Sequence, residues 1–128
     1  MIRLALALLL VMFAAPAFSQ QVPPYVYPLT IGTSSTSILP ANPSRKKLIF
    51  HNPNDTAKVA VCPIGPSRTG SPSTNVVAAI NGAGCITILP YDRVEISSGL
   101  PTSPQSMPSA WVGVASAGGS ALTIMEFE

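Results

Sequence analysis

The stretch Lys47–Cys62 reads KLIFHNPNDTAKVAVC, and it predicts the fold class. Its two ends, Lys47–His51 and Thr56–Cys62, are short runs of β-favouring residues. The Asn-Pro-Asn-Asp between them is a turn signal, because Pro presets φ and the Asn and Asp side chains hydrogen-bond to nearby backbone. Two β runs around such a turn predict a β-hairpin.

Further short apolar runs bounded by Gly, Pro and Asn follow this stretch. They are Val76–Ile80, Cys85–Leu89, Arg93–Ile96, Ala110–Ser116 and Ala121–Phe127. The Asn81-Gly82 pair predicts a hairpin between the first two runs, and Gly118-Gly119 predicts another between the last two.

Two of these runs alternate between residues of different polarity, which indicates one buried face and one solvated face. In Ala121–Phe127 one face carries Leu122, Ile124 and Glu126, and the other carries Thr123, Met125 and Phe127. No segment after residue 19 keeps a helical apolar period for about ten residues. About seven short strands with regular turns predict an all-β chain, a small antiparallel β-sandwich or barrel.

Residues 1–19 have the pattern of a signal peptide. Arg3 precedes the unbroken apolar run Leu4–Ala15, and small residues before the cleavage point favour processing after Ser19 or after Ala17. The rival interpretation, a membrane anchor, requires about 20 apolar residues. We therefore expect an N-terminal signal helix that is removed, and export to the periplasm or the cell exterior. The mature chain then divides into an extended Pro/Ser/Thr-rich arm over 20–37 and a β-sandwich domain over 38–128.

The composition indicates a folded domain with little charge. Hydrophobic residues make up 47% of the chain and charged residues 9%, against about 25% charged in typical soluble domains. Disorder usually combines low hydrophobicity with high charge, which is the opposite balance. The seven Lys and Arg residues less Arg3 leave six against five Asp and Glu, so the mature net charge is +1. Such a chain has no electrostatic reason to bind nucleic acid or anionic lipid.

The mature chain has two cysteines, Cys62 and Cys85. An even number in an exported chain predicts one disulfide, whereas a reducing cytoplasm would favour two buried free thiols. A disulfide at this spacing would stabilise the fold by on the order of 3 kcal/mol through the unfolded state.

The sequence contains no convincing catalytic motif, and we expect that the protein is not an enzyme and has no catalytic residues and no cofactor. The single histidine, His51, could be drawn into a triad with Asp55 or Asp92 and one of many serines, but no Gly-x-Ser-x-Gly elbow is present. Asp92 and Glu95 flank a strand start and have the pattern of solvated charges. One His and two distant Cys do not make a metal-binding pattern, so we expect no metal site.

Two further motifs have simple structural interpretations. Arg45-Lys46-Lys47 is the only basic cluster, and a charged edge that discourages strand pairing explains it better than a phosphate or lipid site. Asn54-Asp55-Thr56 matches the N-glycosylation pattern, but in a turn its first role is conformational.

Four apolar or aromatic residues are candidates for interaction. Tyr25, Val26 and Tyr27 lie on the Pro-stiffened arm, where we expect them to dock on a neighbouring subunit or along the edge of their own sandwich. The prolines around them exclude a central strand. Trp111, the only tryptophan, is either a core anchor or a sugar-stacking or interface residue.

The segment Ile38–Asn52, ILPANPSRKKLIFHN, resembles the opening of small β-sandwich proteins encoded in the structural regions of tailed phages and prophages. Those proteins carry an Asn-Pro-x-Arg-Lys stretch, an apolar strand, an Asn-containing turn and a second strand. The Trp111 run, the Ala117-Gly118-Gly119 turn and Leu122–Glu126 resemble their closing hairpin, so the likeness covers about residues 36–127.

The resemblance implies a virion-associated role, such as a decoration, fibre-base or spike component, with self-association or a protein assembly partner. The signal peptide and the disulfide depart from this family and leave open a host-exported module of the same fold. The alternatives are a periplasmic or secreted binding module, with carbohydrate stacked on Trp111, and an enzyme.

Overall fold

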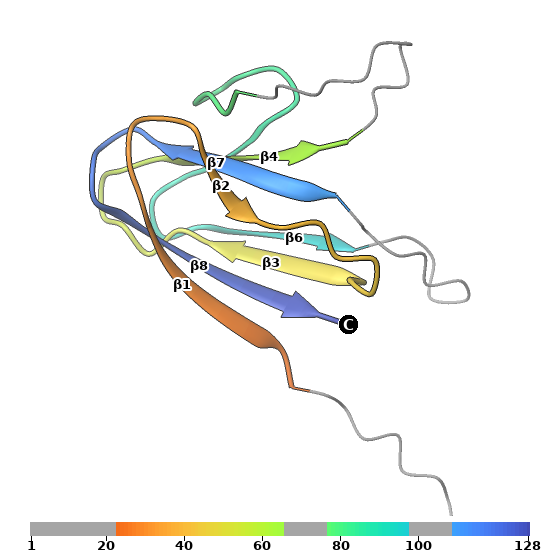
Figure 1. The fold of residues 1–128 in the computed structure, drawn as a ribbon. Helices are drawn as coiled ribbons and strands as arrows, with labels where there is room; N and C mark the ends of the chain where they lie inside the picture. Colours follow the sequence, from red (N-terminus) through yellow and green to blue (C-terminus); the bar gives the residue numbers. More distant parts are fainter. Residues whose placement is uncertain (1–22, 66–76, 98–108) are drawn as a thin grey trace, which may run out of the picture.

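The computed structural model describes residues 23–65, 77–97 and 109–128, which form a two-layered β-sandwich (Figure 1). The strands are β1 (Tyr25–Ile31), β2 (Thr36–Leu39), β3 (Lys47–His51), β4 (Val59–Ile64), β5 (Ile86–Ile88), β6 (Arg93–Ser97), β7 (Ala110–Ala115) and β8 (Ser120–Phe127). All pairings are antiparallel, in a first sheet of order β1-β8-β3-β6 and a second sheet of order β2-β7-β4-β5. The all-β, two-sheet prediction is confirmed with eight strands described rather than about seven; the expected signal helix lies outside the described residues.

The main core fills the space between the two sheets with inward-facing apolar side chains. They are Ile31, Ile38, Leu39, Leu48, Phe50, Val59, Val61, Ile88, Trp111, Ala115, Leu122 and Ile124. Phe50 of β3 and Trp111 of β7 meet across the layers, with ring centroids 5.0 Å apart. Gly113 lets the Ile38 side chain approach β7 closely, because a Cβ at Gly113 would lie 3.1 Å from Ile38 Cγ2.

Consecutive strands lie in opposite sheets, except β4 and β5. The hairpins predicted over residues 47–62 and 110–127 are therefore wrong, because the members of each pair belong to different sheets. A turn motif specifies that the chain reverses, but it does not specify whether the next strand pairs with the last one or crosses the core. Here the crossing allows both strands of each pair to bury an apolar face against the opposite sheet.

The predicted strand over Val76–Ile80 does not form over its described part. Residues 77–85, which we call the flap, run as successive turns in which Gly82 N donates to Ala79 O and Cys85 N to Gly82 O. Asn81 adopts a left-handed backbone with φ of 57°. The predicted hairpin through Asn81-Gly82 is thus a folded loop that leads into β5.

The segment from Tyr25 to Ile31 is the edge strand β1 of the first sheet (Figure 1), so it lies along the edge of its own sandwich, one of the two placements expected for it, and belongs to the domain rather than to a separate arm. The expected boundary at residue 38 also falls inside a strand, because β2 begins at Thr36. The prediction that prolines exclude a central strand is consistent with this position, since Pro28 lies within β1 and has no N–H to donate.

Candidate interaction surfaces

Three of the predicted interaction residues lie side by side on β1 and are exposed to solvent. The exposed fractions are 48% for Tyr25, 54% for Val26 and 37% for Tyr27. Successive side chains of a strand point to opposite faces. Val26 therefore projects from the outer side of the first sheet, while Tyr25 and Tyr27 project from the side that packs on the second sheet.

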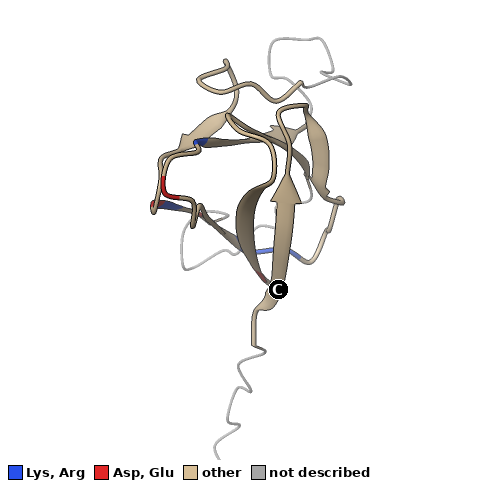
Figure 2. Cartoon of the chain, turned by 90° about the vertical axis from the view of Figure 1, so that its left-hand side faces the viewer, with Lys and Arg blue, Asp and Glu red and all other residues tan. Residues whose placement is uncertain are grey.

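The outer face of the first sheet carries an apolar row across three strands. The register pairs Val26 with Met125 and Met125 with Ile49, so these side chains share one face. Pro28 and Phe127 extend the same surface, and we call these five residues the open face. Met125, Ile49 and Phe127 are only partly buried, and no described segment covers them. Charged positions are sparse on the ribbon (Figure 2); on this side of the first sheet the register places Lys47, Glu95 and Arg93, all on β3 and β6.

Charge appears toward the β6 side of the open face. Lys47 Nζ lies 2.8 Å from Glu95 Oε1 and 5.2 Å from the centre of the Phe127 ring. Because Lys47 and Glu95 are both partly exposed, this pair contributes little to stability. The contacts hold the Lys47 head beside Phe127, at the rim of the apolar row.

The outer face of the second sheet, in contrast, is covered by the flap. A second apolar cluster forms there between the outward side chains of β4 and β7 and those of the flap: Ala60, Cys62, Ala78, Val112 and Val114, with Ile64, Ile80 and Cys85 against them. The continuous apolar runs of β4 and β7 were the sequence signal for this cover, because a strand buried on both faces does not alternate.

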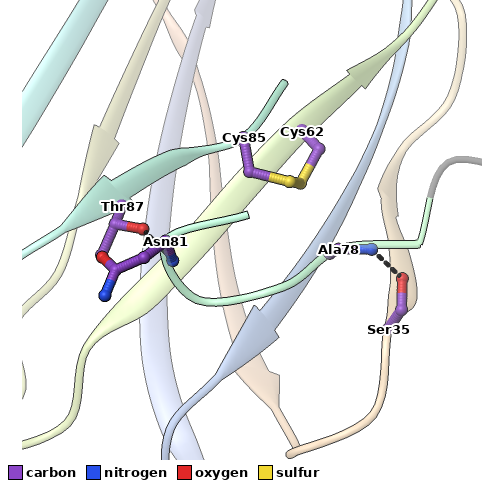
Figure 3. Close-up of a disulfide and its surroundings, with 6 residues drawn as sticks. All are labelled: Ser35, Cys62, Ala78, Asn81, Cys85 and Thr87. Carbon is purple, nitrogen blue, oxygen red and sulfur yellow. Dashed lines mark hydrogen bonds between the residues drawn. A yellow bond between two sulfur atoms is a disulfide. The ribbon is translucent and has the colours of Figure 1, made fainter. Parts of the chain in front are cut away.

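The predicted disulfide between Cys62 and Cys85 is confirmed, with the Cα atoms 4.3 Å apart and the S–S distance 2.04 Å (Figure 3). It joins the flap to β4. Ala78 N also donates to Ser35 Oγ at 2.9 Å, which holds the start of the flap next to the loop before β2 (Figure 3). A disulfide-bonded pair fits a non-reducing compartment.

Arg45 is fully buried rather than part of a charged edge. Its Nε lies 2.9 Å from Glu126 Oε1, its Nη1 donates to Ser109 O at 2.6 Å, and its Nη2 donates to Pro40 O at 2.9 Å. Asn42 Nδ2 also donates to Glu126 Oε1, at 2.6 Å. The Arg45 side chain thus ties β8 to the chain segments beside β2 and β7.

Glu126 also influences the edge strand. Desolvation raises the pKa of the Tyr27 hydroxyl, and the charge of Glu126 and a hydrogen bond to it raise it further. The tyrosine is therefore held in its neutral form beside the carboxylate.

Two asparagines stabilise the crossing that follows β3. Asn52 is buried, and its Nδ2 donates to the carbonyl oxygens of Ala57, Ile88 and Leu89. Asn54 Nδ2 donates to Ala121 O, and its Oδ1 accepts from Ala121 N at 2.9 Å. A glycan on Asn54 would replace a donor that these contacts use, so the structure favours the conformational role.

Trp111 is only 4% exposed and packs against Phe50. Its Nε1 is buried without a hydrogen-bond partner. A ring in this position cannot present a face to a sugar, so the carbohydrate hypothesis loses the residue on which it depended.

The candidate catalytic residues His51, Asp55 and Asp92 lie near one another, but no described hydrogen bond joins their side chains. His51 ends β3, and its Nδ1 lies 3.3 Å from the backbone oxygen of Asp92 rather than from a carboxylate. Asp55 and Asp92 are exposed on separate turns. Among the described residues, no three His, Cys, Asp or Glu side chains gather as a metal site would require.

The described part of the chain also contains no helix with the length and apolar character needed to span a membrane. Comparison with models of known protein families gives no match, and comparison with curated proteins gives none either.

Proposed function

We propose that this chain is an exported, non-catalytic structural protein of the virion-associated decoration or spike type, which assembles with copies of itself through the open face. The observation that carries the proposal is the difference between the two sheets. The flap covers the outer apolar face of the second sheet, whereas no described segment covers Val26, Ile49 and Met125 on the first sheet, where Val26 is exposed and the other two are partly exposed. A contiguous exposed apolar patch is typical of an interaction site.

A second copy is the occupant that the charges favour. The mature net charge of +1 gives copies little mutual repulsion. The centre of the face, where β8 pairs with β1 and β3 around Met125, carries no charged side chain. Two such faces can therefore pack against each other without burying an unpaired charge.

The signal-peptide pattern of residues 1–19 and the Cys62–Cys85 disulfide support export. The likeness to phage structural proteins over about residues 36–127 supports the virion-associated type.

The test is a charge placed on the open face. Met125→Lys or Ile49→Lys should weaken self-association at least about 100-fold, because burying such a side chain contributes about 1.5–3 kcal/mol and a buried lysine adds a desolvation cost. Ala83→Lys is the control, since Ala83 is exposed in the flap, on the outer side of the other sheet. Sedimentation velocity over a concentration series measures the association, and circular dichroism checks the fold. A wild-type protein that stays monomeric at about 100 µM, or lysine variants that associate like the control, would overturn the proposal.

A further inference from the structure

The edge strand β1 is attached to the sandwich on one side only. It pairs with β8 over seven register positions, from Tyr25 with Glu126 to Ile31 with Ser120, and none of the described strands lies on its other side. Its burial is uneven, because Tyr25 to Pro28 are exposed while Ile31 is 2% exposed. The apolar anchoring of β1 is therefore concentrated at its last residues.

The link after β1 is suited to act as a hinge. Residues 32–35 are Gly-Thr-Ser-Ser, and they carry the chain from the first sheet to the second. A backbone bond from Ala115 N to Gly32 O at 2.8 Å holds the start of this link, and the hydroxyl of Ser35 at its end accepts from Ala78 N at 2.9 Å. A Cβ at Gly32 would have no atom within 4 Å, so the backbone there has room to turn. Fully extended, these four residues would span about 13 Å.

Removing β1 would leave a slot of known shape. The slot consists of the β8 edge from Ser120 to Glu126 and the core space that Ile31 fills. The segment that matches this slot in register and side chains is β1 itself. We infer that β1 is exchanged between copies, so that β1 of one chain pairs with β8 of another at the register seen here. This inference rests on the proposed function and supplies its connecting element.

Exchange is favoured over simple addition of strands at this edge. Pro28, in the middle of β1, has no N–H, and a proline on an edge strand opposes pairing with a further strand. An exchanged β1 keeps every native pair with β8. The free energy of the exchanged oligomer therefore differs from that of the closed monomer through the conformation of the hinge and through the loss of translational freedom on association.

The experiment tests whether the register forms between chains. Thr30 and Ala121 are register partners, and both are exposed, so cysteines there leave the core and the open face unchanged. Thr30→Cys and Ala121→Cys proteins, each made separately, are mixed at equal concentration in the assembled state and treated with a mild oxidant. Exchange predicts a Thr30–Ala121 cross-link between chains, identified by mass spectrometry of the linked peptides, in at least about tenfold higher yield than from a control mixture.

The control mixture pairs Ala121→Cys with Thr36→Cys, because Thr36 is exposed on β2 and β2 pairs with β7 in the other sheet. Oligomers in light scattering without a cross-link above this control would overturn strand exchange and leave assembly through the open face intact. A protein that is monomeric throughout would overturn both. The Thr30→Cys/Ala121→Cys double variant, oxidised when dilute, should close within one chain and lose the capacity to form exchanged oligomers.

Discussion

The buried ion pair between Arg45 and Glu126 allows a quantitative test of what holds β8 in place. The side chains are 0% and 3% exposed, and the Nε–Oε1 distance is 2.9 Å. Arg45→Met leaves the Glu126 charge buried, with the side chains of Asn42 and Tyr27 still donating to it. Breaking one partner of a buried pair costs about 3–5 kcal/mol. That cost is a large part of the total free energy of unfolding of a domain, which is about 5–15 kcal/mol.

The double variant Arg45→Met/Glu126→Met should be less destabilised than either single variant. It removes both charges, and buried pairs replaced together by apolar residues are often near neutral. The carbonyl oxygens of Pro40 and Ser109 then lose their Arg45 donors, which costs about 1 kcal/mol each. We therefore expect a net loss of about 2 kcal/mol.

Urea unfolding, followed by the fluorescence of Trp111 in the core, measures all three variants. Lys47→Met is the control, because the Lys47–Glu95 pair is partly exposed and should contribute at most about 1 kcal/mol. If Arg45→Met cost no more than Lys47→Met, or if the double variant lost the sum of the two single losses, the reasoning about desolvation would be refuted.

Two further predictions concern the flap and the edge strand. Replacing Cys62 and Cys85 together by alanine should lower the free energy of unfolding by about 3 kcal/mol or less, because the disulfide closes a separation of 23 residues. In this variant the rate of amide hydrogen exchange should rise first in the flap (77–85). An equal rise throughout the chain would contradict this prediction. Tyr27 has a pKa above its ordinary value of 10.0 in the fold, so its contribution to stability is present below pH 10.0 and is lost as the pH rises further. Urea unfolding above that pH should show a steeper loss in the wild type than in Tyr27→Phe, and parallel pH curves would exclude the linkage to Glu126.

Exposed sheet edges are a general hazard, and this chain limits it at several points. β1 contains Pro28, and β6 carries the exposed charges of Arg93 and Glu95. β2 has a register irregularity between Ser37 and Leu39, and β5 has only three residues. These features oppose uncontrolled strand addition. They do not oppose the face packing and the strand exchange proposed above, which use the open face and the native β1–β8 register.

The class of fold and most of the strands from Lys47 onward could be predicted from the sequence, with the run Val76–Ile80 as the exception. The alternation in Ala121–Phe127 correctly grouped Leu122, Ile124 and Glu126 on one face of the strand, which is the buried face in the structure. The predicted pairing of Cys62 with Cys85 is also confirmed. The pattern of faces is a local feature, because the alternation of side chains follows from strand geometry. The disulfide follows from the number of cysteines, because two cysteines allow one intramolecular bond.

The distribution of the strands between the two sheets depends on tertiary contacts. β3 and β4 flank a strong turn signal, yet they lie in opposite sheets, because a turn reverses the chain without choosing the pairing partner. Arg45 appeared in the sequence as one member of a basic cluster, and its burial depends on Glu126, 81 residues further along the chain. The same holds for the flap and the open face: which apolar face is covered depends on contacts between distant segments, and sequence patterns of period two or 3.6 do not encode those contacts.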